Sequence, residues 1–342
     1  MKDRPHGRPL RAVCRAGSQM GAAIIMAMLT VTLVTALAAA ALWQQWRSIE
    51  IETATRGRLQ AGWILVGALD WARLILREDA RSGPADHLAE PWAIPLEEAK
   101  LTTFFAAQAS APGGGTASDE TDKDIIQAYM SGQMVDLQSR LNFRNLVDGV
   151  TVSNTALAHF RKLFENLGLD PAEVTRVAEN LRFSLDTSPD NRNANLAPLL
   201  PQRFEQLTWL GLSKASLRIL EPHTTWLPER TAVNLNTASE QVINATLPVD
   251  DLALARRLVT SRTLSHLKTV SEAARLLGDV PGQLSESHHS VSSRYFEVRG
   301  LLRLDDLVVQ ERSLVVRDGL DIKTLWRERI ALPPPAKTAS LQ

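Results

Sequence analysis

Hydrophobic residues in this chain are concentrated in one uninterrupted run close to the N-terminus. No charged residue occurs between positions 16 and 46, and residues 22–43 are apolar apart from three threonines. An α-helix of that length spans roughly 33 Å, which matches the hydrocarbon core of a bilayer at about 30 Å. The pattern therefore predicts a transmembrane helix over 22–43, with Trp43 and Trp46 at the membrane interface.

The helical pattern continues beyond the predicted membrane segment. Residues 44–80 contain no proline, and apolar residues such as Leu59, Trp63 and Val66 recur close to the helical period. We expect a single helix over 22–80, whose first half lies in lipid and whose second half packs on a folded domain. The side chains expected to anchor it in the membrane are Ile24, Ile25, Met26, Leu29, Val31, Leu33, Val34 and Leu37.

The segment before the apolar run indicates the orientation of the helix. Residues 1–15 carry five basic residues and one acid, a net charge of +4 (5 − 1). Basic flanks stay in the cytoplasm, so the chain after Trp46 is expected in the periplasm or outside the cell. A secretory signal and a buried core helix are the alternative interpretations. The apolar stretch of a signal is shorter, about 7–15 residues, and a core helix rarely lacks polar residues over six turns.

The rest of the chain shows shorter strand and helix patterns. Strand-like runs at 133–138 and 140–143, and a region rich in β-branched residues from Tyr295 to Ile330, predict an antiparallel sheet. Asp170, and either Thr237 or Ser239, stand where helices are expected to begin. Between the two strand regions, periodic apolar runs predict helices at 155–167, 171–184, 203–210, 239–246, 250–262 and 270–277. The sequence therefore predicts an α+β fold whose sheet is divided by a large helical insertion.

Charge and composition narrow the function. Lys and Arg together number 38, as do Asp and Glu, so the net charge is zero and bulk electrostatic binding to nucleic acid is not expected. The single cysteine, Cys14, excludes a disulfide framework and a cysteine-based zinc site. The seven histidines show no HExxH spacing, and neither a G-x-S-x-G elbow nor a P-loop occurs. We therefore expect a binding or structural protein rather than an enzyme.

Several segments carry a resemblance to a known family. A basic leader that ends in glycine and is followed at once by an apolar helix resembles the N-terminus of type IV pilin-like proteins. Four further segments make the resemblance more specific. They are QAGWILVGALDWARLILREDA at 60–80, DHLAEPWAIPL at 86–96, VDLQSRLNFRNLV at 135–147 and VNLNTASEQVI at 233–243. Together they resemble the minor pseudopilin K family of the type II secretion pathway, and they cover most of the chain in order.

The resemblance implies processing and a domain order. A prepilin peptidase would cut after Gly21 and leave Ala22 as the methylated amino terminus, with a cut after Gly17 as the alternative. The implied order is a leader (1–21), an N-terminal helix (22–80), a pseudopilin α+β domain (81–150 and 291–330), an inserted α-helical domain (151–290) and a flexible tail (331–342). The protein would then be a single-pass inner-membrane protein with a cytoplasmic N-terminus and a periplasmic C-terminal domain.

The resemblance also implies a role and partners. Most pilin-like proteins have a glutamate at the fifth mature position, whereas Met26 occupies it here. A carboxylate there is costly unless it pairs with the amino terminus of a neighbouring subunit, and a subunit that has no neighbour above it has no amine to neutralise. The family is thought to cap the pseudopilus tip and to prime its assembly. The implied partners are other minor pseudopilins, the major pseudopilin and the prepilin peptidase, with exported proteins as further candidates.

An oxygen-rich loop is the candidate metal site. Calcium takes six to eight oxygen ligands, and residues 186–195 are rich in carboxylates and amides. The family is known to bind calcium in its periplasmic domain, usually through a denser acidic loop. A solvated polar loop without a metal is the other interpretation. The candidate calcium ligands are Asp186, Asp190, Asn191 and Asn193.

Two other functions compete with a pseudopilin. Residues 233–278 also resemble tandem helix-hairpin-helix units, which would make the chain a membrane-tethered DNA-binding or uptake protein. Such units need a glycine-rich hairpin, but the turn at 247–251 has no glycine and ends in Asp250 and Asp251. Asn234 and Asn236 are instead expected to tie loops together. The second alternative, a minor pilin of a type IV pilus, does not account for the helical insertion.

Processing is the first testable prediction. Glycine lets the backbone extend into a protease site without a side chain, so Gly21→Val should block maturation. Intact mass or N-terminal sequencing of the protein produced with a prepilin peptidase should give a chain that begins at Ala22. A mature chain that begins near Leu42, after the alanine run, would instead indicate an ordinary secreted protein.

Overall fold

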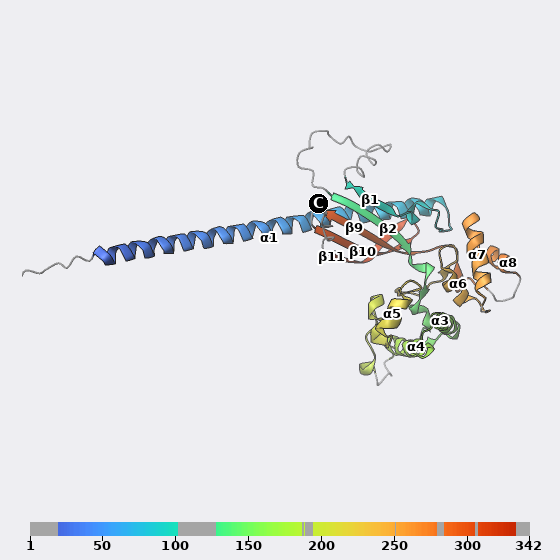
Figure 1. The fold of residues 1–342 in the computed structure, drawn as a ribbon. Helices are drawn as coiled ribbons and strands as arrows, with labels where there is room; N and C mark the ends of the chain where they lie inside the picture. The colour runs from blue at the N-terminus through green and yellow to red at the C-terminus, as the bar shows by residue number, and fades with distance from the viewer. Residues whose placement is uncertain are drawn as a thin grey trace, which may run out of the picture. The chain divides into compact units, whose positions relative to one another are not determined.

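The computed structural model describes residues 20–101, 128–186, 188, 194–249, 251–278, 284–304 and 307–332. It divides into two units after Leu59. The first unit contains the N-terminal part of helix α1 (Met20–Ser82), and the second contains the rest of α1, a five-stranded sheet and a block of short helices (Figure 1). The predicted α+β class is confirmed, and the helix expected over 22–80 extends two residues further at each end.

In the first unit, α1 carries the apolar run. All eight predicted anchor side chains are more than half exposed, and the helix is long and apolar enough to cross a membrane. The threonine hydroxyls donate to carbonyls one turn earlier: Thr30 to Ala27 at 2.9 Å and Thr32 to Leu29 at 3.0 Å. Thr35 does the same toward Val31. Because these hydroxyls are satisfied within the helix, they do not oppose an apolar surrounding.

The sheet of the second unit is antiparallel, with strand order β1-β2-β9-β10-β11. The C-terminal meander was predicted correctly, whereas β1 and the first half of β2 were not predicted. The predicted strand at 140–143 is confirmed only at Leu141–Asn142, because the Asn142 side chain accepts from Arg144 N and starts a 3₁₀ turn. The strands are β1 (Leu96–Lys100), β2 (Ala128–Asp136), β9 (Tyr295–Leu304), β10 (Leu307–Asp318) and β11 (Asp321–Leu332).

Within the second unit, the C-terminal part of α1 packs on one face of this sheet. Leu65 lies in a cluster with Leu302, and Leu76 lies in another with Phe296. A glycine permits the close approach, because a Cβ at Gly62 would lie 2.8 Å from the Arg329 guanidinium. The opposite face of the sheet carries a smaller cluster built by Leu137, Leu227, Tyr295, Leu314 and Val316.

The helical block is inserted between two neighbouring strands. The chain leaves the sheet after β2 and returns at β9, and Asp136 at the end of β2 lies opposite Phe296. The α-helices of the block are α3 (Asn154–Asn166), α4 (Pro171–Leu185), α5 (Lys214–Leu220), α6 (Glu240–Thr246), α7 (Leu252–Leu264) and α8 (Val270–Leu277). Helix α5 was not predicted, and the helix expected at 203–210 is the 3₁₀ helix η5 (Phe204–Leu210).

Short elements connect these helices. The predicted N-caps are confirmed: Asp170 accepts from Ala172 N and Ser239 accepts from Val242 N. One apolar core, which includes Phe143 and Phe160, holds the block together. The remaining elements are η1 (Pro91–Ala93), η2 (Leu137–Ser139), β3 (Leu141–Asn142), η3 (Phe143–Leu146), β4 (Val147–Asp148), β5 (Thr151–Val152), η4 (Ala194–Leu196), β6 (Thr224–Thr225), β7 (Val233–Asn234) and β8 (His289–Ser290).

Replacing each of two glycines by alanine should change the free energy of unfolding in opposite directions. Gly211 ends η5 at φ +98°, and a Cβ there would lie 2.8 Å from Arg176 Cδ, so Gly211→Ala should lower the free energy of unfolding by about 1–2 kcal/mol. Gly67 is exposed within α1 with nothing near its Cβ position, so Gly67→Ala should raise it by about 0.5–1 kcal/mol. Denaturant unfolding of the full chain in detergent measures both, and a loss with Gly67→Ala would contradict this account.

Candidate functional site

Four segments that are distant in sequence meet in a buried polar cluster of the second unit. They are the end of α1 with the loop after it, the end of β2, the stretch around β7 and the segment before β9, and they converge beside β10. We call this cluster the junction network, and its members are Asp79, Asp86, Asp136, Asn234, Ser293 and Arg317. Each member is less than one-tenth exposed.

Asp136 lies at the centre of the junction network, where the chain leaves the sheet. Its Oδ1 accepts from Gln138 N at 2.7 Å. Its Oδ2 accepts from Thr237 Oγ1 at 2.5 Å, Ser293 Oγ at 2.6 Å and Asn234 Nδ2 at 3.1 Å. Burial raises the pKa of the Asp136 carboxyl to about 6, although these hydrogen bonds act in the opposite direction. The carboxyl therefore joins β2, β7 and the segment before β9.

The two asparagines of the 233–243 segment extend the junction network. Asn234 Nδ2 also donates to the Asp86 carbonyl and to Ser293 Oγ, and its Oδ1 accepts from Asn236 N. Asn236 in turn pairs with both the backbone N–H and the carbonyl of Leu267. The prediction that these asparagines tie loops together is confirmed. Their amides are buried within the protein, at 0% and 2% exposure.

An arginine holds two of the acidic members. Arg317 donates through Nη1 to Asp79 Oδ2 at 2.8 Å, and through Nη2 to Asp86 Oδ1 and to the Ser293 carbonyl. Asp86 Oδ2 also accepts from Ser293 N at 2.6 Å. These bonds fix the end of α1 and the following loop to β10 and to the segment before β9.

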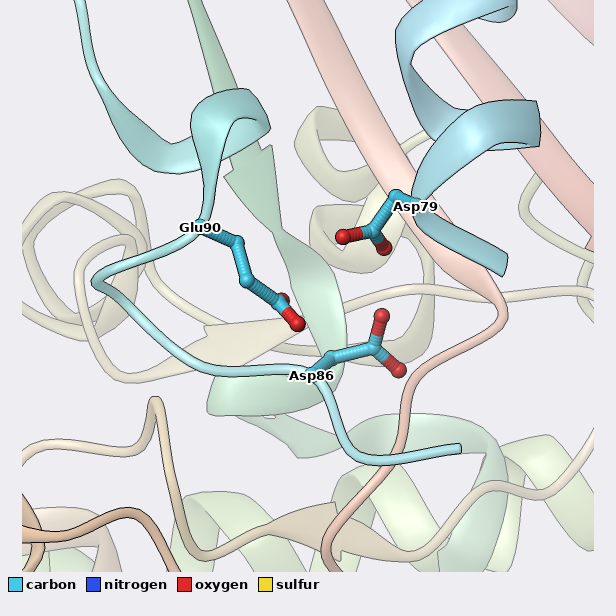
Figure 2. A group of neighbouring side chains, drawn as sticks. All are labelled: Asp79, Asp86 and Glu90. Carbon is cyan, nitrogen blue, oxygen red and sulfur yellow. The ribbon is translucent and has the colours of Figure 1, made fainter. Parts of the chain in front are cut away.

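A third carboxylate lies beside this pair. Glu90 Oε2 accepts from His87 N at 2.9 Å and from Trp92 Nε1 at 2.7 Å. Figure 2 shows the carboxylates of Asp79, Asp86 and Glu90 pointing toward one another, and oxygens of all three lie within 4.8 Å of each other. Burial raises the pKa of Asp79 to about 7, and the charges of Glu90 and Asp86 add to the rise.

An apolar groove of about 270 Å³ lies between α1 and the sheet. Its lining includes Leu69, Ile75 and Met134, with Glu311 at the sheet surface. Arg329 donates to Glu311 at 2.6 Å, so this carboxylate is neutralised by the protein. The groove thus offers an apolar surface for packing.

The predicted site residues fall in three places. Gly21 and Ala22 lie in the first turn of α1, whereas Gly17 and the rest of the leader lie outside the described residues. Asp186 ends α4, and its Oδ1 accepts from Ser188 N at 3.1 Å. The other three candidate calcium ligands, Asp190, Asn191 and Asn193, lie outside the described residues, so that site stays a prediction.

The chemistry of the junction network was not predicted from the sequence. The DHLAEPW and VNLNT segments were noted for their resemblance, but no role was assigned to Asp79, Asp86 or Arg317. The available signal was three acidic residues in two adjoining segments, one at the end of the long helix and two in the turn-rich loop that follows. The distant arginine on β10 could be placed only by the fold.

Comparisons with known proteins agree with this architecture. Residues 139–229 match the family described as type II secretion system (T2SS), protein K. The chain is 26% identical over 309 residues to type II secretion system protein K of Pseudomonas aeruginosa, covering 84% of this chain and 86% of that protein. It is 23% identical to the protein K of Pectobacterium carotovorum, covering 91% of this chain and 96% of that protein.

This chain is similar to type II secretion system protein K over most of its length. Its fold matches a chain in the crystal structure of the GspK-GspI-GspJ complex from the type 2 secretion system of enterotoxigenic Escherichia coli. The TM-score is 0.61 at 20% identity, and the match covers 81% of this chain and 98% of that one. The resemblance to protein K seen in the sequence is therefore confirmed.

The pKa of Asp136 predicts a pH effect on stability. Its folded pKa of about 6 lies above the ordinary aspartate value of 3.8, so its contribution to stability is present at low pH and is lost as the pH rises through 6. The free energy of unfolding of the wild type, relative to Asp136→Asn, should fall by about 2 kcal/mol from pH 4 to pH 7. In Asp136→Asn the side-chain amide near Gln138 N can lower the free energy of unfolding, but this loss is the same at both pH values and cancels in the comparison. Exposed Asp318→Asn should keep the wild-type profile, and an identical profile for Asp136→Asn would contradict the prediction.

Proposed function

We propose that this protein is a minor pseudopilin of a type II secretion system, and that it works by binding rather than by catalysis. One observation carries the proposal: α1 is a single helix whose first part is apolar and exposed, while its second part packs on an antiparallel sheet. This design lets an anchored subunit assemble with others through the helix while the sheet and helical block stay folded. The similarity to protein K over most of the chain supports it.

The proposed location is the inner membrane. The net charge of +4 before the apolar run favours a cytoplasmic N-terminus, which would leave the sheet and helical block in the periplasm. A prepilin peptidase at the cytoplasmic membrane face would remove residues 1–21. The membrane helix would then begin at Ala22 and keep its full apolar length.

Within the pseudopilus we place the protein at the tip, where it primes assembly. Met26 offers no carboxylate for the amino terminus of a neighbouring subunit, so no subunit needs to stack above it. The helical block adds bulk at the end of the sheet where β2 stops and β9 begins, which favours a terminal position over repeated stacking. The solved relative is in a complex with GspI and GspJ, so we propose two other minor pseudopilins as its direct partners. The major pseudopilin and exported proteins would be contacted from this position.

Co-purification tests the partnership. The tagged full chain, produced with the two minor pseudopilins of its own system and extracted in mild detergent, should retain both. Val34→Arg should abolish the complex, because a charge in the middle of the membrane helix is costly. Thr35→Val is the matched control, since the Thr35 hydroxyl bonds only within its own helix in the described structure, and it should keep the complex.

Two results would count against the proposal. If the wild type purifies alone from cells that contain both partners, the partnership is wrong. If the full chain binds duplex DNA in about 0.1 M salt, the DNA-uptake alternative gains instead. Immunogold labelling of overproduced pseudopili tests the tip position separately, and label along the whole length would contradict it.

A further inference from the structure

We propose that Asp79, Asp86 and Glu90 bind one divalent cation, calcium, at the end of α1. The proposal does not depend on the role in secretion. It also concerns a place in the fold different from the oxygen-rich loop at 186–195. The three carboxylates come from the last turn of α1 and from the loop that follows it (Figure 2).

The spacing of the carboxylates suits a calcium ion. One oxygen from each residue lies within 4.8 Å of the other two. Calcium–oxygen distances are about 2.3–2.6 Å, so two ligands on opposite sides of one ion are separated by roughly 5 Å. Hard carboxylate oxygens without sulfur or imidazole ligands favour calcium over zinc or copper, and water molecules can complete the shell.

An orphan oxygen is the second observation. Asp79 is 7% exposed, and its Oδ1 has no hydrogen-bond partner within the part of the chain that the structure describes. Figure 2 shows this carboxylate directed toward those of Asp86 and Glu90. Buried polar atoms are nearly always satisfied, so an oxygen left open beside two other carboxylates indicates a ligand that binds there.

The charge balance of the cluster supports a doubly charged ligand. Three carboxylates contribute −3, and Arg317, which contacts Asp79 and Asp86, contributes +1, which leaves −2. A single calcium ion neutralises that remainder.

The protein's own hydrogen bonds leave the required oxygens accessible to an ion. Glu90 Oε2 takes two donors, and His87 Nε2 lies 3.6 Å from Oε1. Within the described residues each Asp86 oxygen accepts from one donor, so a lone pair on each remains for the metal. Arg317 lies on the other oxygen of Asp79, so guanidinium and ion can bind this carboxylate together.

Terbium luminescence can locate the ion, because Trp92 lies next to it. Trp92 Nε1 is 2.7 Å from Glu90 Oε2, so terbium bound in the cluster should receive energy from this indole. The experiment uses the full chain in detergent, in a background of Asp186→Asn and Asp190→Asn that removes the acids of the other candidate loop. Emission excited through tryptophan is recorded during a terbium titration, followed by competition with calcium chloride and with magnesium chloride.

We expect sensitised emission that calcium displaces and magnesium displaces poorly. Asp79→Asn and Glu90→Gln should each weaken terbium binding by about tenfold or more, because each removes one ligand charge. Glu78→Gln is the matched control: Glu78 adjoins Asp79 but is exposed and paired with Arg81, and binding should not change. Trp92→Phe should lower the sensitised emission while terbium excited directly still binds.

The alternative occupant is a proton on Asp79 that is shared with a neighbouring carboxylate. In that case the background protein shows no saturable terbium site, or a site that responds equally to Asp79→Asn, Glu90→Gln and Glu78→Gln. Either result overturns the proposal. Circular dichroism confirms that each variant is folded, and since Glu90→Gln and Trp92→Phe leave the Asp79–Arg317 pair intact, they decide the question if Asp79→Asn does not fold.

Discussion

A buried carboxylate holds together the place where the helical block joins the sheet. Asp136 ends β2, and its two oxygens accept from four donors that belong to the departing chain, to β7, to Thr237 and to the segment that returns to β9. A charged group without water is costly unless hydrogen bonds surround it. The network therefore specifies one arrangement of these segments, since any other would leave donors and carboxylate unpaired.

Buried charged groups also fix the C-terminal end of α1. Arg317 reaches from β10 to Asp79 and Asp86, so the last turn of the helix and the following loop are fixed to the sheet by ionic contacts rather than by apolar packing alone. The rest of the helix in this unit relies on Leu65, Leu69 and Leu76 against the sheet face. Apolar burial determines which face of the sheet α1 packs on, while the ionic contacts fix the position of its last turn.

Local patterns in the sequence were sufficient for most of the fold. The period of the apolar residues placed α1, α4 and the C-terminal strands, and the caps at Asp170 and Ser239 were visible as single residues. Strand β1 was missed because it is short and mostly exposed, with the sequence LEEAK. The stretch after Leu141 was misassigned because the Asn142 side chain accepts a hydrogen bond from Arg144 N, and this bond overrides the β-like composition of the stretch.

The candidate site was harder to predict, for a physical reason. The membrane helix depends on composition alone, so its residues could be named directly from the sequence. The junction network depends on contacts between residues far apart in the chain, such as Asp79 with Arg317, which no local period reports. Asn234 and Asn236 were recognised as loop ties only because they recur within one short motif.

The position of the insertion also sets an order of folding events. Asp136 and Phe296 are opposite each other in adjacent strands although 160 residues separate them (296 − 136). Closing a loop of that length lowers the chain entropy before the pairing of β2 and β9 stabilises the fold. The helices between these two strands form mainly local contacts. The helical block is thus expected to become compact before β9 pairs with β2. Its compaction shortens the distance that this strand pairing must span. As the chain emerges from the ribosome, the sheet on which the C-terminal part of α1 packs is then the last part to be completed.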